Sequence, residues 1–161
     1  MHCWLLYGRG KLVSEDVIKL EHVWKIFGEN AQAAMEAIEA RNLSKDQVLK
    51  EFKCVVGIAD CSFSVRKGEV FCVIGLSGSG KSTMVRHLNR LIEPTAGFIE
   101  VLGKDMRALS DVDLRAMRAR EIGMVFQHMA LLPHRTVRDN VAFPLQIRGE
   151  SKARRWEISQ Q

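Results

Sequence analysis

The sequence predicts an α/β fold organised around a strand, a phosphate-binding loop and a helix. The first observation is the run VFCVIG, Val70 to Gly75, whose nearly continuous apolar character is typical of a strand buried on both faces of a parallel sheet. The second is the glycine-rich stretch GLSGSGKST, which begins at Gly75 and has almost no packing surface. The third is the segment STMVRHLNRLI after it, whose apolar residues recur at helical spacing. The 161 residues, 47% of them apolar, are enough for one domain with a real core.

Two further strands are expected on the N-terminal side of the loop. The segment VIKLEHVWKIFG, 17–28, is rich in β-branched and aromatic residues and ends in glycine, as strands often do. The segment CSFSV, Cys61 to Val65, alternates apolar and polar residues and is followed by a turn. Residues 1–16 form an N-terminal extension in this division of the chain.

A helical insert is expected between these two strands, over residues 29–52. This segment is rich in Ala, Glu, Lys and Gln, and its apolar residues have helical spacing. Ser44 followed by Gln47 matches a capping box, the signal for a helix N-terminus. The insert is therefore predicted to be two short helices that meet near Asn42, on the surface of the domain.

Beyond the loop, strand and helix patterns alternate. The predicted elements are a strand over Phe98–Gly103, a helix over Asp111–Glu121 capped by Ser110, a strand over Ile122–Gln127, and a helix opened by Thr136 and Asp139 with Pro144 inside it. The polar tail, 149–161, gives no clear stop signal for this last helix.

Composition narrows the class of protein. No apolar run approaches the roughly 18 residues that a membrane-spanning helix needs, and no secretory signal peptide is expected. The net charge of +5 is compatible with a preference for anions. The four cysteines have no metal-binding spacing, and Cys72, inside an apolar run, is expected to be a buried, reduced thiol.

The glycine-rich stretch matches the pattern G-x-x-x-x-G-K-[ST] of nucleotide-binding loops, with Gly75, Gly80, Lys81 and Ser82 at the fixed positions. Glycines let the backbone approach phosphate oxygens closely, and the positive end of the following helix dipole favours the anion. The lysine supplies a full positive charge, and the serine hydroxyl can bind Mg²⁺. The complete predicted phosphate site is Gly75, Ser77, Gly78, Ser79, Gly80, Lys81, Ser82 and Thr83.

The stretches LNRLIEPTAGFIEVLGKD and IGMVFQHMALLPHRTVRDNVAFPL resemble the nucleotide-binding subunits of ABC transporters. The resemblance implies an ABC-type P-loop NTPase fold that binds ATP and Mg²⁺. It places Gln127 at the family's Q-loop, with a role in contacting Mg²⁺ and the attacking water, beside Ser82 as a metal ligand. KIFG resembles the family's aromatic A-loop, which implies that Phe27 stacks on adenine, with Trp24 as the competing aromatic.

The helical insert, together with GLSGSGKST and LNRLIEPTAG, resembles the subfamily that imports glycine betaine, proline betaine and choline. The resemblance implies a transmembrane permease and a second ATP-binding subunit as partners, and no nucleic acid. It also implies a cytoplasmic location, peripheral on the inner face of the membrane through the permease.

The resemblance stops early, because no LSGG signature and no Walker B strand follow Gln127, and His134 precedes the place of the family's switch histidine. We therefore expect residues 17–161 to be a truncated N-terminal part of the nucleotide-binding domain, without complete catalytic residues. The alternative is a fragment that binds nucleotide or a partner without hydrolysis. A small P-loop kinase is disfavoured by the VFQ and PHRTVRDN stretches.

Overall fold

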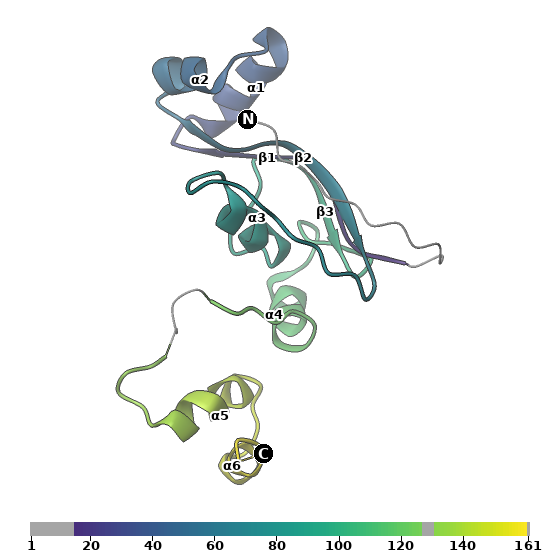
Figure 1. Ribbon diagram of the computed structural model, residues 1–161, viewed down its shortest axis with the longest axis vertical. Coiled ribbons are helices and arrows are strands. Elements are labelled where there is room, and N and C mark those ends of the chain that lie inside the picture. Colours follow the sequence, from purple (N-terminus) through teal and green to yellow (C-terminus); the bar gives the residue numbers. More distant parts are fainter. Residues whose placement is uncertain (1–14, 127–130, 161) are drawn as a thin grey trace. The chain divides into compact units, whose positions relative to one another are not determined.

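The computed structural model describes residues 15–126 and 131–160, and the described residues form two compact units, one up to Leu109 and one from Ser110 onward. The first unit contains β1 (Asp16–Phe27), α1 (Ala31–Arg41), α2 (Lys45–Phe52), β2 (Val55–Arg66), α3 (Lys81–Leu88), β3 (Ala96–Val101) and β4 (Lys104–Asp105). The second contains α4 (Asp111–Arg120), α5 (Val137–Ile147) and α6 (Lys152–Ile158). Figure 1 labels these elements, except for the short β4.

The sheet of the first unit has the order β2-β1-β3-β4, and all three of its strand pairs are antiparallel. The predicted strand over residues 17–28 is confirmed as β1, and the predicted strand at Cys61–Val65 is the second half of the longer β2. The predicted strand at Phe98–Gly103 corresponds to β3, which begins two residues earlier. In Figure 1, α1 and α2 lie on one side of this sheet and α3 on the other.

The helical insert folds as the sequence predicts. Ser44 caps α2 with its hydroxyl, and the Gln47 side chain accepts a hydrogen bond from the Ser44 backbone N–H at 2.8 Å, which completes the capping box. Asn42 ends α1 in the left-handed conformation. The insert is more than a surface addition, because the pair shares a buried core with the sheet, made of Ile26, Ala34, Met35, Ile38, Val48, Cys54 and Val56.

The opposite face of the sheet has a second set of buried apolar residues. Leu20 on β1 pairs with Ile99 on one side and with Phe63 on the other, so all three side chains share this face. The helix α3 contacts β2 and β3, and its buried residues are Met84 and His87. The predicted helix after the loop is therefore confirmed, although it ends at Leu88 rather than continuing to Ile92.

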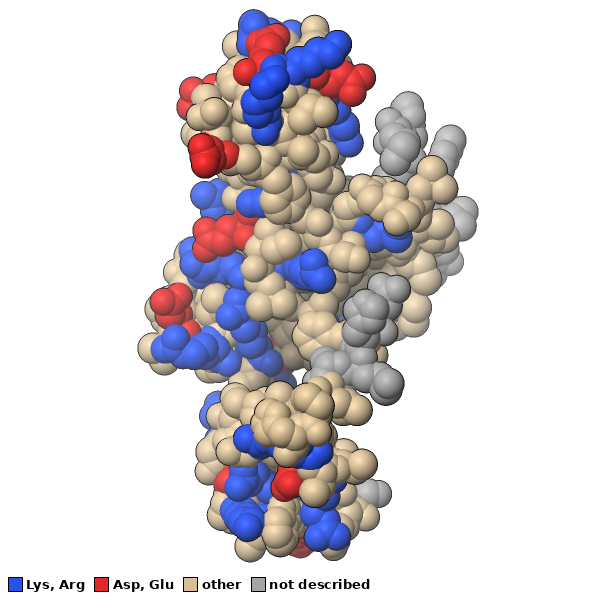
Figure 2. All heavy atoms as spheres, turned by 90° about the vertical axis from the view of Figure 1, so that its left-hand side faces the viewer, with Lys and Arg blue, Asp and Glu red and all other residues tan. Residues whose placement is uncertain are grey.

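The helices of the second unit begin at capping residues. Ser110, Thr136 and Ser151 each accept a hydrogen bond from the backbone N–H three residues later, at the start of α4, α5 and α6 respectively. The helices α4 and α5 were predicted; α6 was missed, although Ser151 is a capping signal that the polar tail concealed. Between α5 and α6 the Trp156 ring lies under two cations, Arg138 and Lys152. Figure 2 shows that basic side chains outnumber acidic ones on the visible face of this unit.

Two predicted strands are wrong. Val70–Gly75 belongs to no sheet, and Val70 and Ile74 are 89% and 67% exposed. The described part of Ile122–Gln127, up to Phe126, is likewise unpaired, with Val125 98% exposed. A strand exists only where a neighbour takes its hydrogen bonds, and no described segment pairs with either run. The predicted parallel sheet is therefore absent from the described residues, and Cys72 is exposed rather than buried.

Candidate functional site

The phosphate loop runs from Gly75 into the first turn of α3. Gly78 and Gly80 have φ of +76° and +92°, in the left-handed region that favours glycine. Gly80 is also the N-cap of α3, and it provides no side chain to bond the first backbone N–H groups of the helix. These N–H groups have no partner within the helix, so they are available to an anion, which the helix dipole also favours.

Lys81 lies inside the loop rather than in solvent. Its Nζ donates hydrogen bonds to the carbonyl oxygens of Gly75 and Leu76, at 2.7 and 2.6 Å, and lies 3.4 Å from the Ser79 hydroxyl. The ammonium group is thereby placed at the centre of the loop, close to the first turn of α3. Ser82 at that turn is exposed, and Thr83 is half-buried. This donor set, one ammonium, several backbone N–H groups and hydroxyls, fits a polyphosphate and one divalent cation.

The segment that leads into the loop is held against β2 by an aromatic stack. The rings of Phe63, on β2, and Phe71 have centroids 4.6 Å apart and planes at 10°. Stacking of this kind contributes about 0.5–1.5 kcal/mol beyond the area that it buries. The stack therefore fixes the approach of the loop to the sheet although the segment 70–75 has no strand partner.

Phe27, the residue predicted to stack on adenine, is brought to the same side of the sheet by a β-bulge. Leu20 and Val23 both point to the face that α3 covers, so His22, with φ of +48°, is an extra residue between them. The bulge reverses the alternation of the strand, and from Val23 onward the odd-numbered residues point to this face. Without it, Phe27 would point to the face covered by α1 and α2.

The bulge is fixed by contacts across the two strands. His22 Nδ1 lies 2.7 Å from the Asp60 carboxylate, and the His22 backbone N–H donates to the Ser62 hydroxyl at 2.8 Å. Asp60 itself has φ of +45°, so both strands depart from regular geometry at the same point. The end of β1 is held by Thr95, whose hydroxyl accepts a hydrogen bond from the Ile26 N–H at 2.9 Å.

Phe27 and the phosphate loop meet at Gly57, a residue that sequence reasoning missed. A Cβ atom at position 57 would lie 2.6 Å from Cε2 of the Phe27 ring, and a Cβ atom at Gly80 would lie 2.5 Å from the Gly57 carbonyl oxygen. The Phe27 ring thus contacts β2 at Gly57, and β2 in turn contacts the loop at Gly80. An isolated glycine inside an apolar strand pattern, VVGIA, was the available signal, because such a glycine often marks a close approach.

Two basic side chains line the face near Phe27. The Lys25 ammonium lies 5.2 Å from the centroid of the Phe27 ring, a cation–π geometry. His87 on α3 is 1% exposed, and its Nδ1 lies 2.5 Å from the Ile92 carbonyl oxygen. Burial lowers the pKa of His87, and the charge of Lys25 lowers it further, against the opposing effect of the Ile92 carbonyl. His87 is therefore a neutral packing residue.

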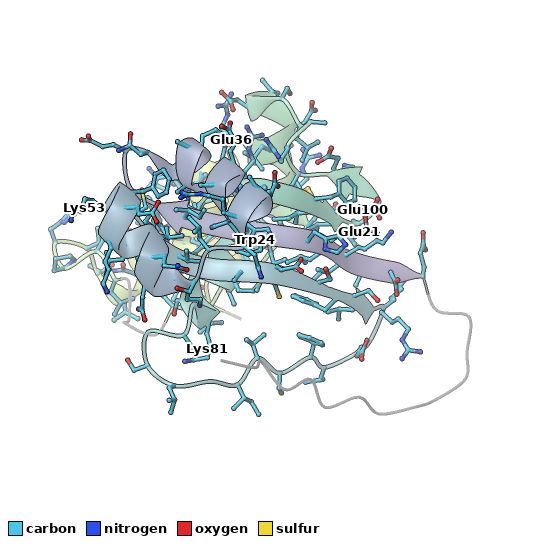
Figure 3. The ribbon with its side chains drawn as sticks, turned by 90° about the horizontal axis from the view of Figure 1, so that it is seen from above. Glu21, Trp24, Glu36, Lys53, Lys81 and Glu100 are labelled. Atoms are coloured by element: carbon cyan, nitrogen blue, oxygen red, sulfur yellow. The ribbon has the colours of Figure 1, made fainter. Side chains whose placement is uncertain are left out.

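Trp24, the competing aromatic, is on the other face. It packs against the core shared by α1, α2 and the sheet. In Figure 3 it lies at the sheet beside α1 and α2, whereas Lys81 lies on the loop that passes the β2 side of the sheet. The structure thus brings Phe27 and residues 75–83 together and leaves Trp24 apart. Gln127 lies outside the described residues, and among the described residues no group of three or more His, Cys, Asp or Glu could hold a metal ion.

Comparison with known proteins gives a consistent set of matches. A model of the ABC transporter family matches residues 58–161. The glycine betaine/proline betaine transport system ATP-binding protein ProV of Escherichia coli (strain K12) is 47% identical over 140 residues, covering 87% of this chain and 35% of ProV. The trimethylamine N-oxide transport system ATP-binding protein TmoW of Pelagibacter ubique is 47% identical over 137 residues, 85% of this chain and 40% of TmoW.

A methionine import ATP-binding protein, MetN of Desulfitobacterium hafniense, is 50% identical over a shorter stretch, 71% of this chain and 33% of MetN. The chain therefore spans about a third of the length of these relatives. Among solved structures, a dimeric ATP-binding cassette bound to ADP and Pi superposes with a TM-score of 0.68 at 25% identity, covering 89% of this chain and 54% of the cassette.

Proposed function

The chain belongs to the ABC transporter family, and we propose that it is the N-terminal part of an ATP-binding, energy-coupling subunit of an importer for quaternary-ammonium osmoprotectants. Membership confirms the predicted family resemblance, and the structural match confirms the ABC ATPase type of α/β fold. The observation that carries the proposal is the position of Lys81 at the centre of a glycine loop that opens α3.

Each part of the loop has a role in binding the phosphates of ATP. The uncapped backbone N–H groups at the start of α3 would donate to phosphate oxygens, and Lys81 would exchange its bonds to the loop carbonyls for bonds to phosphate. The exposed Ser82 hydroxyl would be a ligand of Mg²⁺, with Gln127 as the second proposed ligand. When bound, the metal neutralises charge on the phosphates.

Phe27 is the proposed platform for adenine. The residue is 41% exposed, so it is partly open to a ligand, and it is linked to the loop through Gly57. Base–aromatic stacking of this kind contributes about 1–3 kcal/mol. Trp24 is less suited to the role, because it packs on the opposite side of the sheet with the helical pair.

The class of solute and the partners are inferred from the relatives. ProV, TmoW and the glycine betaine transport proteins OpuAA and GbuA are named for betaine or amine-oxide transport, and each is 46–47% identical to this chain. We therefore propose a transmembrane permease and a second ATP-binding subunit as partners, at the inner face of the membrane. Within the described residues, no helix is long and apolar enough to cross a membrane.

A second candidate function is nucleotide binding without hydrolysis. The printed sequence has no LSGG motif and no apolar run that ends in a carboxylate pair after Gln127. Hydrolysis needs a group that positions or activates water, which Lys81 and Ser82 do not provide.

Calorimetric titration of the chain with ATP and Mg²⁺ tests the proposal, with phosphate release measured on the same samples. Lys81→Ala should weaken binding about 10- to 100-fold, the equivalent of one hydrogen-bonded charge. Lys67→Ala, a substitution at an exposed turn, should bind ATP like the parent chain. Equal affinity in both variants, or no binding by the parent chain, would contradict the proposal. Binding without phosphate release would favour the second candidate, and release that depends on Lys81 would exclude it.

A further inference from the structure

Gly57 occupies an unusual place between the aromatic ring and the phosphate loop. Its Cα faces the Phe27 ring, since a Cβ atom there would lie 2.6 Å from Cε2 and 3.2 Å from Cδ2 of that ring. Its carbonyl oxygen faces the loop, since a Cβ atom at Gly80 would lie 2.5 Å from it. One strand residue therefore touches the two structures that the proposed function assigns to opposite ends of the nucleotide.

The reason for glycine at this position is space rather than backbone conformation. Gly57 is not among the glycines with positive φ, so an alanine could adopt its backbone angles. Val56 and Ile58, on either side of it, pair with Ile26 and Lys25 of β1, and the register between the strands shifts by one residue at Gly57. Only the closeness of Phe27 excludes a side chain here.

We propose that Gly57 is a positioning residue that sets the place of the Phe27 ring relative to the phosphate loop, and so tunes the site for the base of the nucleotide separately from its phosphates. The inference rests on the proposed function, because it assumes that Phe27 contacts the base. It extends that function by assigning a part in binding the base to a strand residue that makes no contact with the phosphates.

A methyl group at position 57 would act on the ring and not on the loop. Ordinary contact begins near 3.4 Å, so the ring atom at 2.6 Å has to retreat by about 0.8 Å. The ring can do so, because it is the end of a side chain that is 41% exposed. The Gly57 carbonyl, the contact with Gly80, stays where it is. Gly57→Ala should therefore weaken ATP binding about 3- to 30-fold, a part of what a full stack contributes.

The experiment compares two ligands, MgATP and Mg-tripolyphosphate, which share phosphates but not the base. Gly57→Ala should lose affinity for ATP and keep its affinity for tripolyphosphate. Gly123→Ala is the matched control, because a Cβ atom there meets nothing within 4 Å and no positive φ is involved. It should leave both affinities unchanged.

A double-mutant cycle tests whether the effect passes through the ring. In the background Phe27→Ala the methyl group has room, so adding Gly57→Ala should cause no further loss of ATP affinity. The inference would be overturned if Gly57→Ala weakened binding of both ligands equally or left ATP affinity unchanged. It would also be overturned if Gly57→Ala caused its full loss of ATP affinity in the Phe27→Ala background. If Gly57→Ala itself fails to fold, the double variant still gives this last comparison. Failure of the proposed function is a separate result, namely ATP binding that does not depend on Lys81.

Discussion

Replacing Gly80 by alanine tests whether the phosphate loop is built against β2. Gly80 has φ of +92°, and its Cβ atom would lie 2.5 Å from the backbone oxygen of Gly57. Gly78, two residues earlier, has φ of +76°, and its Cβ atom would meet nothing within 4 Å. The two substitutions therefore share the same backbone strain and differ in one collision.

The expected losses of stability follow from the backbone strain and the collision. A left-handed conformation costs a residue other than glycine about 1–2 kcal/mol, so Gly78→Ala should lower the free energy of unfolding by that amount. Gly80→Ala adds a collision with a strand backbone, which cannot swing away as a side chain can. Relieving it separates α3 from β2, and overpacking of this kind costs about 1–3 kcal/mol. The expected total for Gly80→Ala is roughly 2–5 kcal/mol.

Urea unfolding of the three chains without nucleotide measures this difference, so that binding does not enter the comparison. The two variants should differ by about 1–3 kcal/mol with unchanged m values. Equal destabilisation in the two variants would refute the contact between the loop and β2. It would also remove the structural link on which the role of Gly57 depends.

Two further predictions concern stability away from the loop. Because burial lowers the pKa of His87 from its usual 6.5, the unfolded chain binds the proton more readily, and the fold should lose stability as pH falls below about 6.5. In thermal unfolding, His87→Gln should lose less stability between pH 6.5 and 5 than the parent chain does. The control His134→Gln, at an exposed position, should show the same dependence of stability on pH as the parent chain. The same loss of stability in His87→Gln as in the parent chain would contradict the conclusion that His87 is buried and neutral. Ser44→Ala should cost about 1 kcal/mol through loss of the α2 cap, measured by urea unfolding. Gln47→Ala, which breaks the other half of the capping box, should cost less, and no change in either variant would show that the box does not stabilise the insert.

The parts of the fold that were predicted correctly are those that local sequence determines. The Ser44 capping box is satisfied by residues within one helical turn, so a short pattern was enough to place α2. The pattern G-x-x-x-x-G-K-S was likewise enough to predict the loop before α3. The wrong predictions are strands, because Val70–Gly75 has the composition of a buried strand but pairing depends on a distant neighbour. Apolar composition indicates that a segment is suited to burial, but it does not show whether another segment of the chain packs against it.

The candidate site depends both on local sequence and on the pairing of distant strands. Lys81 and its loop follow from local sequence, but the face on which Phe27 lies depends on the extra residue at His22, which no periodicity revealed. A regular β1 would present Trp24 to the loop and Phe27 to the helical pair, so the sequence left the two aromatics as alternatives. One bulge, fixed by the contact of His22 with Asp60, determines which of the two aromatics lies on the same side of the sheet as the loop. The proposed phosphate half of the site is thus encoded in nine consecutive residues, whereas its proposed base half depends on the register of two strands.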